Sequence, residues 1–152
     1  MTENFAAQIA EIEAQEARLQ FTRFTHEDAL ALGLLIVRLG TERSLGITVD
    51  ITKGDQQVFH VSLAGTTADN DDWIARKIRT TRRFATSSLA IRVQRDLKGG
   101  GFDWLDPELY AISGGCVPIR VGGALVGTAT VSGLPDHEDH ALVIEAMRAL
   151  LG

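Results

Sequence analysis

The chain has 152 residues, 45% of them hydrophobic, and carries a formal net charge of -5 at pH 7. This length predicts one domain with a sizeable core, residues 1–152, and the acidic balance argues against general nucleic-acid binding, which needs a dominant basic surface. The single cysteine, Cys116, excludes an intrachain disulfide and a cysteine-rich zinc module.

The first segment has the spacing of an amphipathic helix over about residues 3–20. Phe5, Ile9 and Ile12 lie three or four residues apart, whereas Glu16 interrupts the series where another apolar residue would fall. We expect this helix to lie on its own domain or on a neighbouring subunit. The opening residues lack the basic start, apolar run and cleavage site of a secretory signal, which predicts a cytoplasmic protein.

A second helix is expected to begin after Thr25, because Asp28 follows three residues later and completes a capping box. It should end near Gly40. Its apolar run, residues 29–37, is about half as long as a membrane-spanning helix requires, so we expect a buried helix and no membrane span.

From residue 47 on, the spacing of the apolar residues changes to every second position, which is typical of strands. Apolar and polar residues alternate over 47–52 and again over 58–63, which predicts an antiparallel hairpin with its turn at Gly54. The acidic run at 69–72 favours the start of a helix that continues to roughly Leu89. Residues 97–110 contain three consecutive glycines and form the best candidate for a mobile loop.

The last third predicts a second hairpin, with Gly122 and Gly123 at its turn, and a final helix capped by Asp136 and Asp139. Pro118 places its strand at a sheet edge or a bulge, because proline donates no ladder hydrogen bond. Separate hairpins and helices predict an α+β domain on one antiparallel sheet, with a fifth strand near residues 109–113.

Two stretches resemble a known superfamily. The segment "GDQQVFHVSLAGTTADNDDWIARKIRTTRRFATSS", with its DNxxWxxRK motif, is similar to the signature of a family of small cytoplasmic proteins that has no established activity. The segment "ISGGCVPIRVGGALVGTATVSGLPDHEDHALVIEAM" resembles the glycine-rich hairpin and helix of the GlcG/HbpS-like, haem-degrading-domain proteins. The resemblance extends from about Asp28 to Leu150. It implies a profilin-like fold with helices on a five-stranded antiparallel sheet, and a homo-oligomer built from dimers. Because some relatives bind haem, it also implies haem as a candidate ligand.

The helix expected from about residue 69 to Leu89 is rich in basic residues, and we call it the basic helix. It holds five of the fifteen lysines and arginines within positions 76–83. One interpretation is a pocket for a small anion, in which guanidinium groups bind carboxylate or phosphate oxygens beside an indole wall. The other is an interface or a solvated face whose aspartates pair with the arginines, and this interpretation is favoured because charge runs are usually solvated. The candidates in this segment are Asp69, Asn70, Trp73, Arg76, Lys77 and Arg83.

The second group of candidates lies in the glycine-rich stretch. Gly114 and Gly115 would allow backbone amides to approach an anion, although small residues in a row more often form a plain turn. Cys116 has no neighbouring base in the sequence to generate a thiolate, so a small buried cysteine is favoured over a nucleophile. Pro118 completes this group.

Histidines supply the candidates for binding haem or a metal, because neutral imidazole is a common iron ligand. His60 lies on the polar side of its strand, and His137 and His140 are three residues apart at the start of the last helix. A solvated first turn is the favoured alternative for that pair.

The leading hypothesis is therefore a binding protein for haem or another small molecule, assembled as a homo-oligomer. The alternatives are a non-catalytic interaction module and an enzyme acting on a small anionic metabolite, for which the sequence offers no acid, base or nucleophile.

Overall fold

The computed structural model describes residues 4–152. Its helices are α1 (Phe5–Arg18), α2 (His26–Glu42), α3 (Ala68–Phe84), α4 (Ser88–Lys98) and α5 (Asp136–Leu151). Its strands are β1 (Gln20–Phe21), β2 (Thr48–Lys53), β3 (Gln56–Ser62), β4 (Cys116–Val121) and β5 (Ala124–Ser132). Glu3, where the predicted first helix began, lies outside the described residues, and α1 begins after its N-cap Asn4.

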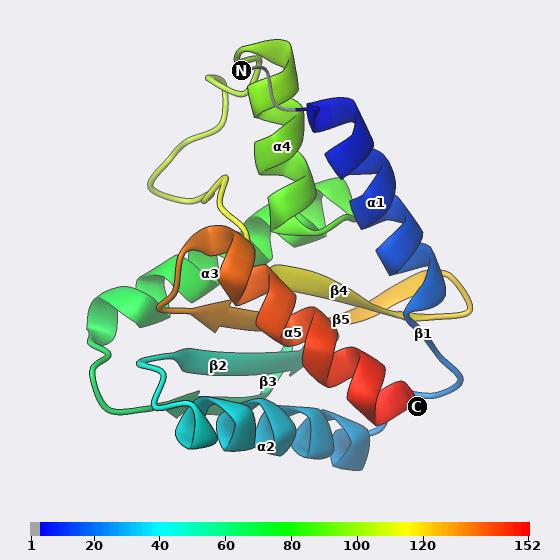
Figure 1. Cartoon of the computed structure of the whole chain (residues 1–152), viewed down its shortest axis with the longest axis vertical. Helices are drawn as coiled ribbons and strands as arrows, with labels where there is room; N and C mark the ends of the chain where they lie inside the picture. Colours follow the sequence, from blue (N-terminus) through cyan, green and yellow to red (C-terminus); the bar gives the residue numbers. More distant parts are fainter. Residues whose placement is uncertain (1–3) are drawn as a thin grey trace.

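The strands form one sheet in the order β1-β4-β5-β2-β3 (Figure 1). The predicted hairpins, β2–β3 and β4–β5, are both present, and β5 joins them by pairing antiparallel with β2. The fifth strand is β1, which runs parallel to β4. The α+β class is confirmed, but the expectation of a purely antiparallel sheet was wrong. β1 has only two residues, which are too few to show the alternation of apolar and polar residues by which a strand is predicted.

The predicted strand at 109–113 was also wrong. This stretch lies along α3: the Ala111 amide donates to the Arg76 carbonyl at 3.2 Å, and the Thr80 hydroxyl donates to the Ala111 carbonyl at 2.8 Å. Its backbone groups therefore bond to a helix instead of a sheet. Pro118 lies in the part of β4 that pairs with β5 only, because β1 reaches no further than Arg120 and Val121. The expected edge position of the proline is thus confirmed.

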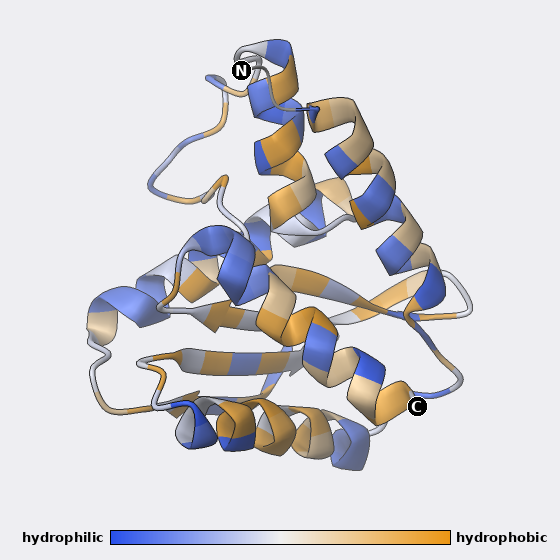
Figure 2. Cartoon of the chain, in the orientation of Figure 1, coloured by the Kyte–Doolittle hydropathy of each residue, from blue (hydrophilic) through white to orange (hydrophobic). Residues whose placement is uncertain are grey.

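The sheet has two faces of different composition, and both are buried. Val49, Ile51, Ala129 and Val131 belong to the main apolar core with residues of α2 and α5. The opposite face carries Thr48, Asp50, Thr52, Thr128, Thr130 and Ser132, all of them at most 4% exposed. α3 crosses this polar face and bonds to it (Figure 1). Figure 2 shows the resulting alternation of apolar and polar residues along the strands.

The basic helix ends earlier than the sequence indicated, and a second helix follows it. α3 stops at Phe84, because Ala85 takes a left-handed conformation with φ 55°. Ser87 then caps α4, its hydroxyl accepting a hydrogen bond from the Ala90 amide. The expected single helix to Leu89 was therefore wrong. The signal for the break was Thr86-Ser87-Ser88, since such residues favour helix starts.

Glu16, the acidic residue that interrupts the apolar stripe of α1, binds the start of α4. It is 7% exposed, and its carboxylate accepts hydrogen bonds from the Ser87 amide at 2.6 Å and the Thr86 hydroxyl at 3.0 Å. The acidic residue that interrupts the apolar stripe of α1 thus binds the first turn of α4. Ile12 packs beside it against Leu89 and Val93, so α1 and α4 lie side by side on one flank of the molecule (Figure 1).

We predict that Glu16→Ala lowers the free energy of unfolding by about 1–3 kcal/mol, because it leaves the buried Ser87 amide without a partner. Glu13→Ala, an exposed change on the same helix, should alter it by less than about 0.5 kcal/mol. Urea unfolding of both variants measures the difference. Equal losses in the two variants would show that Glu16 does not hold α4.

Candidate functional site

The start of α3 uses two of the predicted site residues to fix the helix on the sheet. Thr67 and Asn70 form a capping box, and the Asn70 side-chain amide also donates to the Ser132 hydroxyl at 3.2 Å. The Asp69 carboxylate accepts a hydrogen bond from the Trp73 indole at 3.2 Å. Asp69 and Asn70 therefore have partners within the chain that account for their positions.

Lys77 points into the protein, unlike the exposed Arg79 of the same helix. It is 2% exposed, and its ammonium group donates to the Asp139 carboxylate at 3.0 Å and to the Val131 carbonyl at 3.1 Å. Asp139 also accepts from the Leu134 amide at 2.9 Å. The expected cap at Asp136 and Asp139 was wrong: the N-cap of α5 is Pro135, without a side-chain cap bond. The buried ammonium group of Lys77 needs a paired carboxylate, and Asp139 provides it instead of capping α5.

Gly114 and Gly115, the glycines of the second candidate group, lie beside the Lys77–Asp139 ion pair. Gly115 has φ 136°, and a Cβ there would lie 2.7 Å from the Lys77 ammonium nitrogen and 2.5 Å from the Val131 carbonyl oxygen. The Gly114 amide donates to the Asp136 carboxylate at 3.0 Å, and the Cys116 amide donates to the Ser88 hydroxyl. The amides of Gly114 and Cys116 are thus already bonded within the chain. The predicted contact of this stretch with an external anion stays a prediction.

Burial controls the acid-base properties of this interior. It raises the pKa of the Asp139 carboxyl to about 6, against the opposing effects of Lys77 and the neighbouring amides. It likewise raises the pKa of the Cys116 thiol to about 11. Cys116 is 0% exposed and therefore stays a protonated, inaccessible thiol at neutral pH.

His60 is bound between two carboxylates instead of facing a ligand. Its Nδ1 lies 2.8 Å from Asp50, and its Nε2 lies 2.6 Å from Asp71 in the first turn of α3. Burial acts to lower the pKa of this imidazole, but the two carboxylates outweigh it and hold the pKa above its usual value. His60 therefore links the sheet to α3.

The arginine face of α3 binds the irregular segment that follows α4. Arg76, Arg79 and Arg83 donate to the Pro107 carbonyl, the Leu109 carbonyl and the Tyr110 hydroxyl at 3.5, 3.4 and 3.0 Å. Arg76 also pairs with Asp72 at 2.8 Å and lies 4.1 Å from the ring centre of Trp73. These arginines thus have partners within the chain, and only Arg76 pairs with an aspartate of the same helix. The choice between an interface and an anion site stays a prediction.

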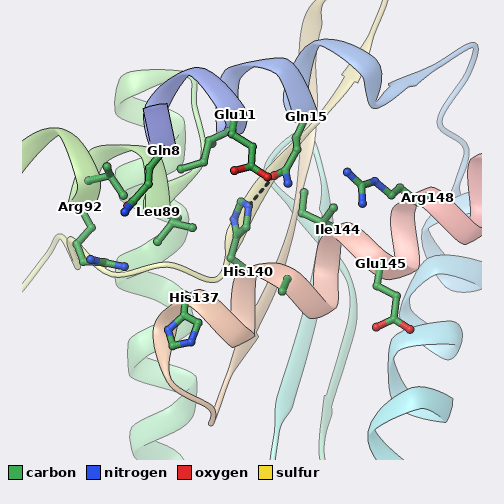
Figure 3. Close-up of a pocket in the computed structure, with 13 residues that line it drawn as sticks. Gln8, Glu11, Gln15, Leu89, Arg92, His137, His140, Ile144, Glu145 and Arg148 are labelled. Carbon is green, nitrogen blue, oxygen red and sulfur yellow. Dashed lines mark hydrogen bonds between the residues drawn. The ribbon is translucent and has the colours of Figure 1, made fainter. Parts of the chain in front are cut away.

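A cavity of about 600 Å³ lies between α1, α4 and α5 (Figure 3). Ile12, Leu89, Val93 and Ile144 supply apolar lining. The polar lining comes from all three helices and comprises Gln8, Glu11, Gln15, Arg92, His137, His140, Glu145 and Arg148. A volume of this size lies within the range typical of small-molecule sites.

The two histidines of α5 both line this cavity, but in different ways. The side chain of His137 is 67% exposed, whereas His140 is 4% exposed and its Nε2 lies 3.4 Å from Gln15 (Figure 3). Burial lowers the pKa of the His140 imidazole to about 4, so the ring is neutral at physiological pH. Its Nδ1 has no hydrogen-bond partner among residues 4–152.

The histidine pair was the one part of this cavity that the sequence singled out. Leu89 was expected at the end of the preceding helix, and Arg92 and Val93 lay in no predicted element, so the sequence did not indicate α4 as a wall of the cavity. Within the described chain, no cluster of three or more His, Cys, Asp or Glu side chains is arranged to hold a metal ion. No helix formed by residues 4–152 has the length and apolar character needed to span a bilayer.

Comparison with known proteins gives the family context of this arrangement. Residues 24–148 match the family described as "Haem degrading protein HbpS-like". The chain is 46% identical over 151 residues to a UPF0303 protein of Streptomyces coelicolor, covering 97% of this chain and 96% of the relative.

Two solved structures show the same fold. The Ybr137w protein superposes with a TM-score of 0.86 at 29% identity, covering 93% of this chain and 86% of that one. A PduOC protein in complex with haem superposes with a TM-score of 0.70 at 15% identity, covering 82% and 93% of the two chains. At that lower identity the likeness establishes the fold alone.

We predict that Lys77→Met lowers the free energy of unfolding by about 3–5 kcal/mol, because it leaves the buried Asp139 without its partner. The double variant Lys77→Met/Asp139→Leu should lose less, since it removes both charges. Lys98→Met, at an exposed position, is the control. Urea unfolding measures these three variants and the single variant Asp139→Leu, and a double variant whose loss equals the sum of the losses of Lys77→Met and Asp139→Leu would contradict the coupling.

Proposed function

The chain belongs to the HbpS-like family of haem degrading proteins, and we propose on that premise that it binds a small amphipathic ligand, with haem as the first candidate. The observation that carries this proposal is the cavity between α1, α4 and α5. It has a volume of about 600 Å³, apolar lining, and polar side chains from all three helices. Such a combination is typical of small-molecule sites.

The lining residues fit haem by their chemistry. Ile12, Val93 and Ile144 would contact the porphyrin ring, and an imidazole would hold the iron. His137 is the accessible imidazole, whereas His140 is enclosed beneath Gln15. Haem, when bound, supplies an iron centre for binding small gases or for one-electron chemistry. The haem complex of the PduOC protein, which shares this fold, supports haem as the first ligand to test.

We propose binding in preference to covalent catalysis. Cys116 is the one thiol of the chain, and burial raises its pKa to about 11. A nucleophilic thiol needs the opposite, an accessible position and a lowered pKa. The arginine face of α3, the alternative site for an anionic metabolite, is bonded to residues 107–110. That contact favours a structural role for these arginines.

We also propose that the protein assembles as a homo-oligomer built from dimers, through the outer face of α2. Leu30 and Leu34 are 47% and 52% exposed there. Glu27 and Arg38 lie on the same face, one toward each end of this apolar stripe. Two copies of α2 packed antiparallel about a twofold axis would place Glu27 of one beside Arg38 of the other. A cytoplasmic location stays a prediction.

Haem titration followed by visible absorbance tests the ligand. We predict a saturable Soret shift with the wild-type protein and at least about tenfold weaker binding by Ile144→Trp, whose larger side chain fills the cavity. His137→Ala should alter the position of the Soret band, because it removes the iron ligand.

Two control variants accompany this titration. Leu109→Trp adds the same bulk at an exposed site outside the cavity, and His26→Ala removes an exposed imidazole from α2. Both should titrate like the wild type. A wild-type protein without a saturable shift, or an Ile144→Trp variant that binds normally, would contradict the proposal.

Light scattering tests the assembly. We predict that Leu34→Glu reduces the mass of the oligomer, because it places a charge at the centre of the α2 stripe. Leu97→Glu changes an equally exposed leucine on α4 and should leave the mass unchanged. If the mass of Leu34→Glu equals that of the wild type, α2 is not the interface.

A further inference from the structure

Two arginines differ from all the others in the described chain. Each of the other arginines has an ion pair or a side-chain hydrogen bond within the protein. Among residues 4–152, Arg18 and Arg148 have neither. A guanidinium group without a carboxylate partner keeps its full capacity to bind an external anion.

Arg18 and Arg148 line the same hollow on the surface. Arg18 is in the last turn of α1, and Arg148 is in the last turn of α5. Both line a depression of about 510 Å³ with Leu19 and Leu151. This depression adjoins the cavity between α1, α4 and α5, because Gln15 and Arg148 line both. Figure 3 shows Arg148 reaching from α5 toward α1.

Arg92 and Glu145, two of the other charged residues of the cavity, are already engaged in ion pairs, whereas Glu11 lines the cavity without an ion pair among residues 4–152. Arg92 is paired with Asp136 and Asp96, and Glu145 is paired with Arg43. Glu145 therefore does not neutralise Arg148, although the two are three residues apart on α5. The cavity thus has an apolar centre, at Ile12 and Ile144, and the second hollow has two arginines and no acidic residue among the described residues that line it.

We propose that the ligand is an amphipathic carboxylate, whose apolar body lies in the cavity and whose carboxylate is bound by Arg148, with Arg18 beside it. This inference rests on the proposed function, because it takes the same cavity as the ligand site. It narrows the ligand to a chemical class that includes tetrapyrrole dicarboxylates and long-chain fatty acids. Arg148 and Arg18 are then the residues that select for the acid.

The experiment compares acids with their esters. The probes are metal-free protoporphyrin IX and cis-parinaric acid, each alongside its methyl ester, and binding is followed by probe fluorescence. We expect the wild type to bind at least one acid about tenfold more tightly than its ester, since a charge-assisted hydrogen bond contributes about this factor. Added salt should weaken binding of the acid and leave the ester unaffected.

Variants assign the effect to the two arginines. Arg148→Ala should bind the acid about tenfold more weakly, Arg148→Lys should retain part of the affinity, and Arg18→Ala/Arg148→Ala should no longer distinguish acid from ester. Arg23→Ala, an exposed arginine that precedes α2 and lies outside both hollows, should bind like the wild type. Because Arg148 has no partner among the described residues, its loss should leave the urea midpoint unchanged.

The outcomes separate this inference from the proposed haem function. Arginine-dependent binding of cis-parinaric acid, by a protein that gives no Soret shift with haem, would support the carboxylate site and remove haem as the ligand. An acid that the double variant binds as tightly as the wild type, or an ester bound as tightly as its acid, would overturn the carboxylate site and leave the cavity as a binding site. Binding of neither acid by the wild type would overturn the carboxylate site, and the absence of a Soret shift with haem as well would overturn the proposed function.

Discussion

Lys77 and Asp139 form a buried ion pair that joins α3, on one face of the sheet, to the start of α5, on the other. Burying two charges is costly, so the surrounding backbone is fitted to them: the Val131 carbonyl and the Leu134 amide complete their hydrogen bonds. Gly115 has no room for a side chain beside them. The pair positions the first turns of α5, and with them the two histidines of the cavity.

The cavity itself depends on a second buried charge, Glu16. By binding the first turn of α4, Glu16 holds α1 beside that helix, and α5 then forms the third wall. Some polar groups that line the cavity also attach its helices, since Arg92 of α4 pairs with Asp136 of α5 and His140 of α5 contacts Gln15 of α1. Arg148 lines the cavity without such a contact among residues 4–152.

The basic residues of the segment 76–83 make several separate contacts within the protein. Lys77 enters the interior, Arg76 and Arg83 attach the segment after α4, and Arg82 donates to the Gly54 carbonyl at the turn of the first hairpin. The DNxxWxxRK motif therefore describes how α3 begins and how it is fixed to the sheet. Among residues 4–152, the arginines without an ion pair or a side-chain hydrogen bond are Arg18 and Arg148, which line the depression beside the cavity and lie far apart in the sequence.

Local patterns were enough to predict both hairpins, the capped start of α2 and the α+β class, because alternation, turn glycines and capping residues act over a few neighbouring positions. The sequence also singled out His137 and His140. Tertiary structure alone decided the rest. The attachment of α4 to α1 depends on Glu16, the parallel pairing of β1 depends on β4, and the cavity depends on three helices. Each of these joins residues far apart in the chain, and no local pattern records which distant partner will satisfy a buried charge.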